Sequence, residues 1–218
     1  MDTDLTDAPG SGTPATATRR RMLGAGIAGA ALSLLPMAVR RAGAQSDSTT
    51  PSSGATTAPP KRPTEADVTL LACAQAVELA AVELYRTAVK AGGLDQSQNL
   101  VLATLLEAHR AFADSISALL GRAAPGETAQ SVVAGRRSGF GSSSITARLA
   151  AASELESALV ATHRQIIGQL AGTDGAARVA SILVAEARHG TLLADVAGAT
   201  DLGSLLVDRE ATAIKAGG

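Results

Sequence analysis

The chain of 218 residues has no tryptophan, one tyrosine, two phenylalanines and a single cysteine. One cysteine cannot form a disulfide within the chain, which excludes an internal disulfide framework. The shortage of aromatic rings removes the usual platforms for stacking on bases, and a net charge of -1 gives no attraction to phosphates. We therefore expect no nucleic acid among the partners of this protein.

Small aliphatic residues dominate instead. Hydrophobic residues make up 46% of the chain, with alanine and leucine prominent, which favours closely packed helices. The length suits one medium-sized domain. Cys73, in "LLAC", loosely resembles the cleavage box of a lipoprotein, but no apolar run directly precedes it. We therefore place Cys73 inside a helix.

The N-terminal segment has the parts of a signal peptide in order. A basic cluster that includes Arg19 and Arg20 precedes an apolar run, and a small-residue cleavage site follows at Ala42 and Ala44. The stretch "TRRRML" resembles the motif of twin-arginine translocation, which implies that the twin-arginine translocase exports the chain and that residues 1–44 are removed. An uncleaved signal that anchors the chain to the membrane is the alternative.

Residues 45–63 form a tract rich in serine, threonine and proline, without apolar periodicity, and we predict a disordered spacer there. The pattern becomes helical from residue 64, and we assign a helical domain to residues 64–207 and a C-terminal tail to residues 208–218.

The periodicity of apolar residues predicts four helices, with Thr64 as the N-cap of the first and glycine near the end of each. They span about 65–91, 96–121, 144–171 and 174–197. Short loops join the first helix to the second and the third to the fourth. Between the pairs lies a long Gly-rich linker, in which we interpret "GRRSGFG" as a solvated loop rather than an anion site. The prediction is an all-α fold of two helical hairpins joined by a long crossover.

The two hairpins resemble each other in sequence. "VELAAVELYRTA" in the first helix aligns with "LESALVATHRQI" in the third, so that Glu78 matches Glu156 and Tyr85 matches His163.

Helical geometry places several ionisable residues in the apolar stripes. Glu186 and His189 form a Glu-x-x-His motif on one face of the fourth helix. The "LEAH" of the second helix is not such a motif, because Glu107 falls on the polar face and Leu106 stands where the acid would be. His163 is central in the stripe of its helix, and His189 lies at the edge of its own. Four residues face the core and also lie near the middle of their helices: Glu78, His109, Glu156 and Glu186.

Because these four lie near the middle of their helices, we expect them to meet at one level of the bundle, with His189 about one turn away. Buried carboxylates must be satisfied by one another, by water or by a metal ion.

Three segments, "AVELAAVELYRTA", "EAHRAFADSISALLGRAAPG" and "ASILVAEARHGTLLADVAG", resemble the ferritin-like superfamily, and more closely the exported ferritin-like-domain proteins of actinobacteria. The resemblance covers residues 64–207 and implies a ferritin-like four-helix bundle. Di-iron members supply one Glu from each of two helices and a Glu-x-x-His from each of the other two. Carried over to this sequence, the implied metal ligands are Glu78, His109, Glu156, Glu186 and His189, with Leu106 in place of the sixth.

A missing acid leaves di-iron chemistry open, but three Glu and two His suit one Fe, Mn or Zn ion. Tyr85 and His163 lie about two turns beyond their own glutamates, and we expect them outside the direct ligands. The alternative is a non-catalytic structural or binding module of the cell envelope, in which the buried network only fixes the helices. Substrate and homo-oligomeric state stay open.

Overall fold

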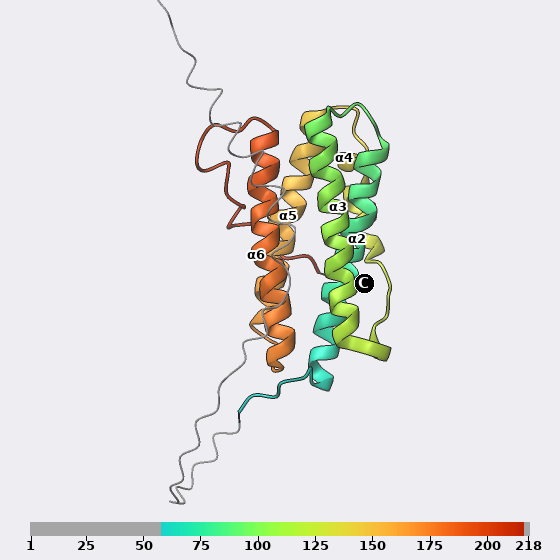
Figure 1. Cartoon of the computed structure of the whole chain (residues 1–218), viewed down its shortest axis with the longest axis vertical. Helices are drawn as coiled ribbons and strands as arrows, with labels where there is room; N and C mark the ends of the chain where they lie inside the picture. Colours follow the sequence, from blue (N-terminus) through green and yellow to red (C-terminus); the bar gives the residue numbers. More distant parts are fainter. Residues whose placement is uncertain (1–57, 216–218) are drawn as a thin grey trace, which may run out of the picture. The chain divides into compact units, whose positions relative to one another are not determined.

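The computed structural model describes residues 58–215, and within that range it contains helices and no strands. The described elements are α2 (Glu65–Lys90), α3 (Gln96–Leu120), the short 3-10 helix η1 (Gly121–Ala123), α4 (Gln130–Phe140), α5 (Ile145–Ile167) and α6 (Thr173–Val196). This confirms the predicted all-α fold class (Figure 1). The predicted signal features at Arg19, Arg20, Ala42 and Ala44 lie outside the described residues, as does the spacer up to residue 57.

Local sequence signals fix where the first two bundle helices begin. The N–H of Asp67 donates to Thr64 Oγ1 at 3.3 Å, and the N–H of Thr64 donates to Asp67 Oδ2 at 2.8 Å. Asp95 and Gln98 form the same reciprocal capping box at the start of α3. Each box satisfies backbone N–H groups that have no partner within the helix, which is why these helices begin at the predicted residues.

The predicted end of the third helix at residue 171 was wrong, because α5 ends at Ile167. The chain then makes a tight loop to α6. A Cβ on Gly172 would lie 2.7 Å from the carbonyl oxygen of Arg62 and 2.9 Å from Asp67 Oδ2. Glycine therefore lets this loop lie against the start of α2.

The four long helices form two hairpins. Figure 1 shows α2 beside α3 and α5 beside α6, and these two pairs share the most extensive contacts. Their buried apolar side chains form two clusters. The larger cluster contains residues from the later part of α2 and from the early parts of α3 and α5, together with Leu193 of α6. The smaller cluster takes Leu71 of α2, the later part of α3, Ile166 of α5, and Val179 and Ile182 of α6.

This order of contacts shows that α3 and α5 run antiparallel to α2, while α6 runs parallel to it. The predicted bundle of two hairpins is thus present. Between the two apolar clusters lies the level at which the buried ionisable residues occur.

The crossover between the hairpins contains a helix, so its prediction as a loop was wrong over residues 130–140. Helix α4 buries Val132, Val133 and Phe140 and packs against α2 and α5. Its apolar stripe is short and is interrupted by glycines, which hid it in the sequence. One of these glycines has a packing role, since a Cβ on Gly139 would lie 2.8 Å from the Cβ of Ala151 on α5.

Two buried charged side chains connect the hairpins at opposite ends. The carboxylate of Asp67, at the start of α2, accepts the N–H groups of Ala171 at 2.8 Å and Gly172 at 2.9 Å in the loop before α6. Arg148 of α5 donates to the carbonyl oxygens of Ala88 at 3.1 Å and Gly92 at 2.7 Å, where α2 ends. Each charge is satisfied by backbone groups of the other hairpin, so both ends of the bundle are fixed.

Segments on both sides of the bundle sequence pack onto it. The carbonyl oxygens of Pro60 and Lys61 accept the N–H groups of Thr173 and Asp174 at 3.0 and 2.9 Å, so the end of the predicted spacer lies against the start of α6.

The chain after α6 returns along α5. The N–H of Asp208 donates to Ser157 Oγ at 3.0 Å, and the N–H of Ile214 donates to Thr162 Oγ1 at 2.8 Å. The first part of the predicted C-terminal tail therefore lies against α5.

Helix α2 is the one described helix whose length and apolar composition would suffice to cross a membrane. More than half of its apolar window, 56%, is buried inside the bundle. Because a buried core helix passes the same test, the criterion by itself does not place the chain in a membrane.

Candidate metal centre

Six glutamate and histidine side chains meet between the two apolar clusters, and we call them the polar centre. They come from all four bundle helices: Glu78 of α2, His109 of α3, Glu156 and His163 of α5, and Glu186 and His189 of α6. Five of them are completely buried, and the side chain of His189 is 13% exposed. The five ligands predicted from the sequence are thus brought together, and His163 lies among them.

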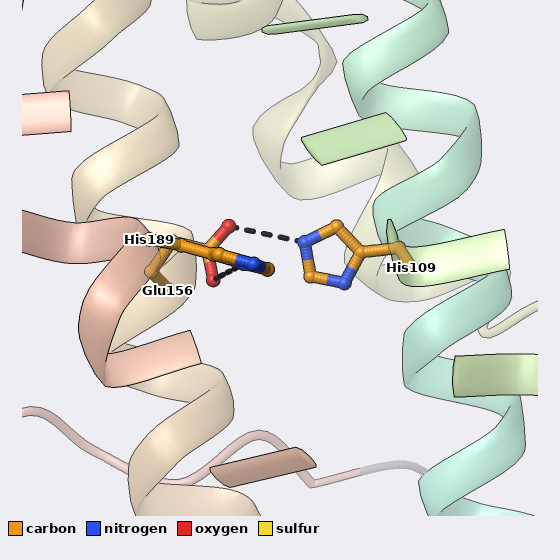
Figure 2. A group of neighbouring side chains, drawn as sticks. All are labelled: His109, Glu156 and His189. Atoms are coloured by element: carbon orange, nitrogen blue, oxygen red, sulfur yellow. Dashed lines mark hydrogen bonds and ion pairs between the residues drawn. The ribbon is translucent and has the colours of Figure 1, made fainter. Parts of the chain in front are cut away.

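The polar centre contains two groups whose donor atoms lie within 4.8 Å of one another. The first, which we call the histidine-rich triad, consists of His109, Glu156 and His189 (Figure 2). His109 Nε2 lies 3.0 Å from Glu156 Oε1, and His189 Nδ1 lies 3.3 Å from Glu156 Oε2. Tyr85 also donates its hydroxyl to Glu156 Oε1 and stacks on the His109 ring, with 5.1 Å between ring centroids. Both carboxylate oxygens of this triad are therefore engaged.

The second group, the carboxylate-rich triad, consists of Glu78, His163 and Glu186 and is completely buried. His163 Nδ1 lies 2.8 Å from Glu186 Oε2, in hydrogen-bond contact. His163 Nε2 lies 3.3 Å from Glu78 Oε1 without forming a hydrogen bond. Among residues 58–215, three buried side-chain atoms, one from each member of this triad, have no hydrogen-bond partner: Glu78 Oε1, His163 Nε2 and Glu186 Oε1.

His109 links the two triads. Its Nδ1 lies 2.8 Å from Glu78 Oε2, while its Nε2 faces Glu156. Burial alone would lower the pKa of His109, but the charges of Glu156 and Glu78 and the hydrogen bonds to them raise the pKa well above its usual value. Both ring nitrogens therefore carry protons and donate to the two carboxylates.

The two triads differ in charge. Burial would raise the pKa of Glu156, but the charges of His109 and His189 hold it well below its usual range. By contrast, burial raises the pKa of Glu186 well above its usual value, and the carboxylates of Glu78 and Glu156 add to this. Burial also lowers the pKa of His163. Opposite charges thus attract each other in the histidine-rich triad, whereas in the carboxylate-rich triad two carboxyl groups lie together and raise the pKa of Glu186.

The donor set fits a transition-metal ion. Carboxylate oxygens together with imidazole nitrogens suit Fe, Mn and Zn. Within residues 58–215, no lysine or arginine forms an ion pair with the polar centre. The three unpartnered atoms of the carboxylate-rich triad are the donors that such an ion requires.

The sequence places Tyr85 and His163 about two turns beyond the glutamates of their own helices, and we expected them outside the direct ligands. Instead, each crosses to the other hairpin: Tyr85 of α2 donates to Glu156 of α5, and His163 of α5 lies beside Glu78 of α2. The sequence held a signal for this, because the two pairs are related by the internal repeat and α2 and α5 are antiparallel.

The helical-wheel assignments of the second helix agree with the structure. Glu107 is exposed and pairs with Arg110 at 2.8 Å, so it takes no part in the polar centre. Leu106 is partly buried and packs against the larger apolar cluster.

A family model described as a ferritin-like domain matches residues 66–199. No curated protein and no solved structure matches the chain.

Proposed function

Because the chain belongs to the ferritin-like domain family, we propose that its bundle core binds a transition-metal ion, with Fe, Mn and Zn as candidates. One observation carries the proposal: six metal-donor side chains are buried together, and apart from Tyr85 their polar partners are one another. Burying a carboxylate without a cation is costly. A bound ion would offset that cost and would supply Lewis-acid chemistry, or redox chemistry in the case of Fe or Mn.

The chain's own residues have separate parts in this proposal. Glu78 and Glu186 provide carboxylate oxygens to the cation, whose charge would in turn favour the ionised form of both. Tyr85 and His109 hold Glu156 by hydrogen bonds, which fixes its orientation. His189, as the only partly exposed member, is the point at which the polar centre meets solvent.

Elemental analysis tests this function directly. Protein isolated from its native host should carry about one Fe, Mn or Zn ion per chain, as expected for a closed protein site. A Glu78→Gln/Glu186→Gln double variant should carry less than about one tenth of that amount, because two anionic ligands are lost. A Glu107→Gln variant, altered at an exposed glutamate, is the control and should keep the ion.

A second candidate is a structural module without metal. It is favoured by His109, whose two nitrogens already satisfy Glu78 and Glu156. Native protein that lacks a metal ion, and whose unfolding temperature does not change when Fe²⁺, Mn²⁺ or Zn²⁺ is added, would establish this candidate and exclude the first.

We also propose that the protein acts outside the cytoplasmic membrane after twin-arginine export. Support comes from the "TRRRML" motif and from the apolar run and small-residue site that follow it. An Arg19→Lys/Arg20→Lys variant should accumulate in the cytoplasm, whereas the native chain should be recovered from the envelope or medium. Equal export of both would refute this route.

A further inference from the structure

We propose that the ion is held by the carboxylate-rich triad, Glu78, His163 and Glu186, so that His163 is a metal ligand and His109 and His189 are not. This inference rests on the proposed metal-binding function and names its ligands. It departs from the ligand set that the resemblance to the ferritin-like superfamily implies, because that set does not include His163.

The first argument is the position of the unpartnered atoms. Glu78 Oε1, His163 Nε2 and Glu186 Oε1 are buried and lack a hydrogen bond. A buried polar atom without a partner has lost its hydrogen bonds to water and gained none in return, which destabilises the fold. Three such atoms in one triad form a set that a single cation would satisfy together.

The second argument is that each ligand is held by its other polar atom. Glu78 Oε2 accepts from His109 Nδ1 at 2.8 Å, and His163 Nδ1 and Glu186 Oε2 are 2.8 Å apart. A neutral imidazole that donates from Nδ1 keeps the lone pair of Nε2 free. Metal-binding histidines commonly donate their second nitrogen to a carboxylate in this way, which fixes the ring orientation.

The third argument is the spacing of the donors. His163 Nε2 and Glu78 Oε1 are 3.3 Å apart. Two donors that are each about 2.0–2.1 Å from a tetrahedral ion lie about 3.3 Å from each other. Three protein ligands would leave a further coordination position for water or a small anionic ligand.

The histidine-rich triad lacks these properties. Glu156 Oε1 already receives hydrogen bonds from Tyr85 and His109, and Glu156 Oε2 lies 3.3 Å from His189 Nδ1. An ion bound there would have to displace His109 from Glu156. Through His109, whose other ring nitrogen donates to Glu78, this triad instead orients one ligand of the other.

Proton NMR of the wild-type protein loaded with Co²⁺ counts the ligating histidines without any mutation. Each imidazole bound to Co²⁺ gives one strongly shifted exchangeable N–H signal. We expect one such signal, from His163 Nδ1. Two signals, or none, would overturn the assignment.

A matched pair of variants identifies the histidine. His163→Ala should lose the ion, with Co²⁺ binding weakened more than about 10-fold, since even partners outside the direct ligands typically cost 10–100-fold in affinity. His189→Ala, altered in the same polar centre, should bind Co²⁺ within about 3-fold of wild type, because His189 is paired with Glu156 and not with any of the three proposed ligands. Circular dichroism should show that both variants stay helical. If His163→Ala does not fold, the number of shifted N–H signals in the wild-type protein alone decides between the two ligand sets.

The outcomes separate the two proposals. Loss of Co²⁺ from folded His189→Ala, with or without loss from His163→Ala, contradicts the ligand set while the metal-binding function stands. Wild-type protein that binds no Fe²⁺, Mn²⁺, Zn²⁺ or Co²⁺ contradicts the function itself and the ligand set with it.

Discussion

The two hairpins of the bundle have related sequences but contribute unequally to the polar centre. The α2–α3 hairpin supplies Glu78 and His109, whereas the α5–α6 hairpin supplies four residues. At two related positions the residue types differ: Tyr85 corresponds to His163, and Leu106 corresponds to Glu186. The first hairpin thus has a phenol and an aliphatic side chain where the second has an imidazole and a carboxylate.

This difference explains why only one triad has unpartnered atoms. The Tyr85 hydroxyl donates to Glu156, and no further ring atom needs a partner. The His163 ring has a second nitrogen, and that nitrogen has no hydrogen bond. The second hairpin has His163 where the first has Tyr85, and Glu186 where the first has Leu106. These two differences therefore make the carboxylate-rich triad a candidate ion site and leave the histidine-rich triad hydrogen-bonded.

The largest effect is expected when the second hairpin is given the residues of the first. A His163→Tyr/Glu186→Leu variant removes two of the three proposed ligands, so metal affinity should fall more than about 100-fold. Isothermal titration with Mn²⁺ or Zn²⁺ measures this. A Glu154→Gln variant, altered at an exposed position of α5, serves as control, and unchanged affinity in the double variant would contradict the comparison.

The reverse exchange should add a site. A Tyr85→His/Leu106→Glu variant gives the first hairpin an imidazole and a carboxylate opposite Glu156. We expect the number of bound ions to rise from about one to about two per chain, since three donors of the same kinds would then surround a second position. Native mass spectrometry reports the stoichiometry. If the variant still binds one ion per chain, the related positions of the two hairpins are not equivalent as metal ligands.

A smaller effect on stability is expected from a charge that only the first hairpin has. Asp67 is buried, and Ile145 stands at the related position of α5. Burial would raise the pKa of Asp67, but the N–H groups of Thr64, Ala171 and Gly172 hold it below its usual value. An Asp67→Asn variant should lose about 2–3 kcal/mol of unfolding free energy at neutral pH, because it loses hydrogen bonds to a charged acceptor.

The pH dependence of that loss has a definite sign. A pKa depressed by folding means that the stabilisation is present above the unfolded value of about 3.9 and disappears as pH falls through the lower folded value. Urea unfolding should therefore show the difference between wild type and Asp67→Asn at pH 6 and a smaller one below pH 4. A difference that is constant over this range would show that the charge of Asp67 is not responsible.

The smallest effect on stability is expected when the hydrogen bond from Tyr85 of the first hairpin to Glu156 is removed. Tyr85→Phe removes the hydrogen bond to Glu156 but keeps a ring that can stack on His109, so unfolding free energy should fall by about 1–2 kcal/mol. Metal content should stay unchanged, because Tyr85 is not among the proposed ligands. Chemical denaturation and elemental analysis of one preparation measure both, and loss of the ion would assign Tyr85 a direct part in binding.

The fold was largely predictable because its signals are local. Capping residues such as Thr64 lie next to the helix starts that they determine. Helix α4 was missed because its three buried residues give too short a stripe, and its helical state depends on packing against α2 and α5.

The sequence predicted which residues of the polar centre face the core, but it did not predict which of them contact each other. A helical wheel places Glu78 and His163 toward the core, but it does not tell which residues of antiparallel helices come to the same level. That depends on how far one helix is displaced along the other, which is set by tertiary packing. For this reason the sequence did not show that Tyr85 and His163 each meet a glutamate of the other hairpin.

The hydrogen bonds of the polar centre join residues that are 23 to 71 positions apart in the chain. Contacts of such long sequence separation close large loops, which makes them slow to form. They also draw on every bundle helix at once, so no helix can detach while the centre survives. We therefore expect backbone amides beside Glu78 and Glu156 to exchange their hydrogens only through global unfolding, and amides near the helix ends to exchange through local fraying.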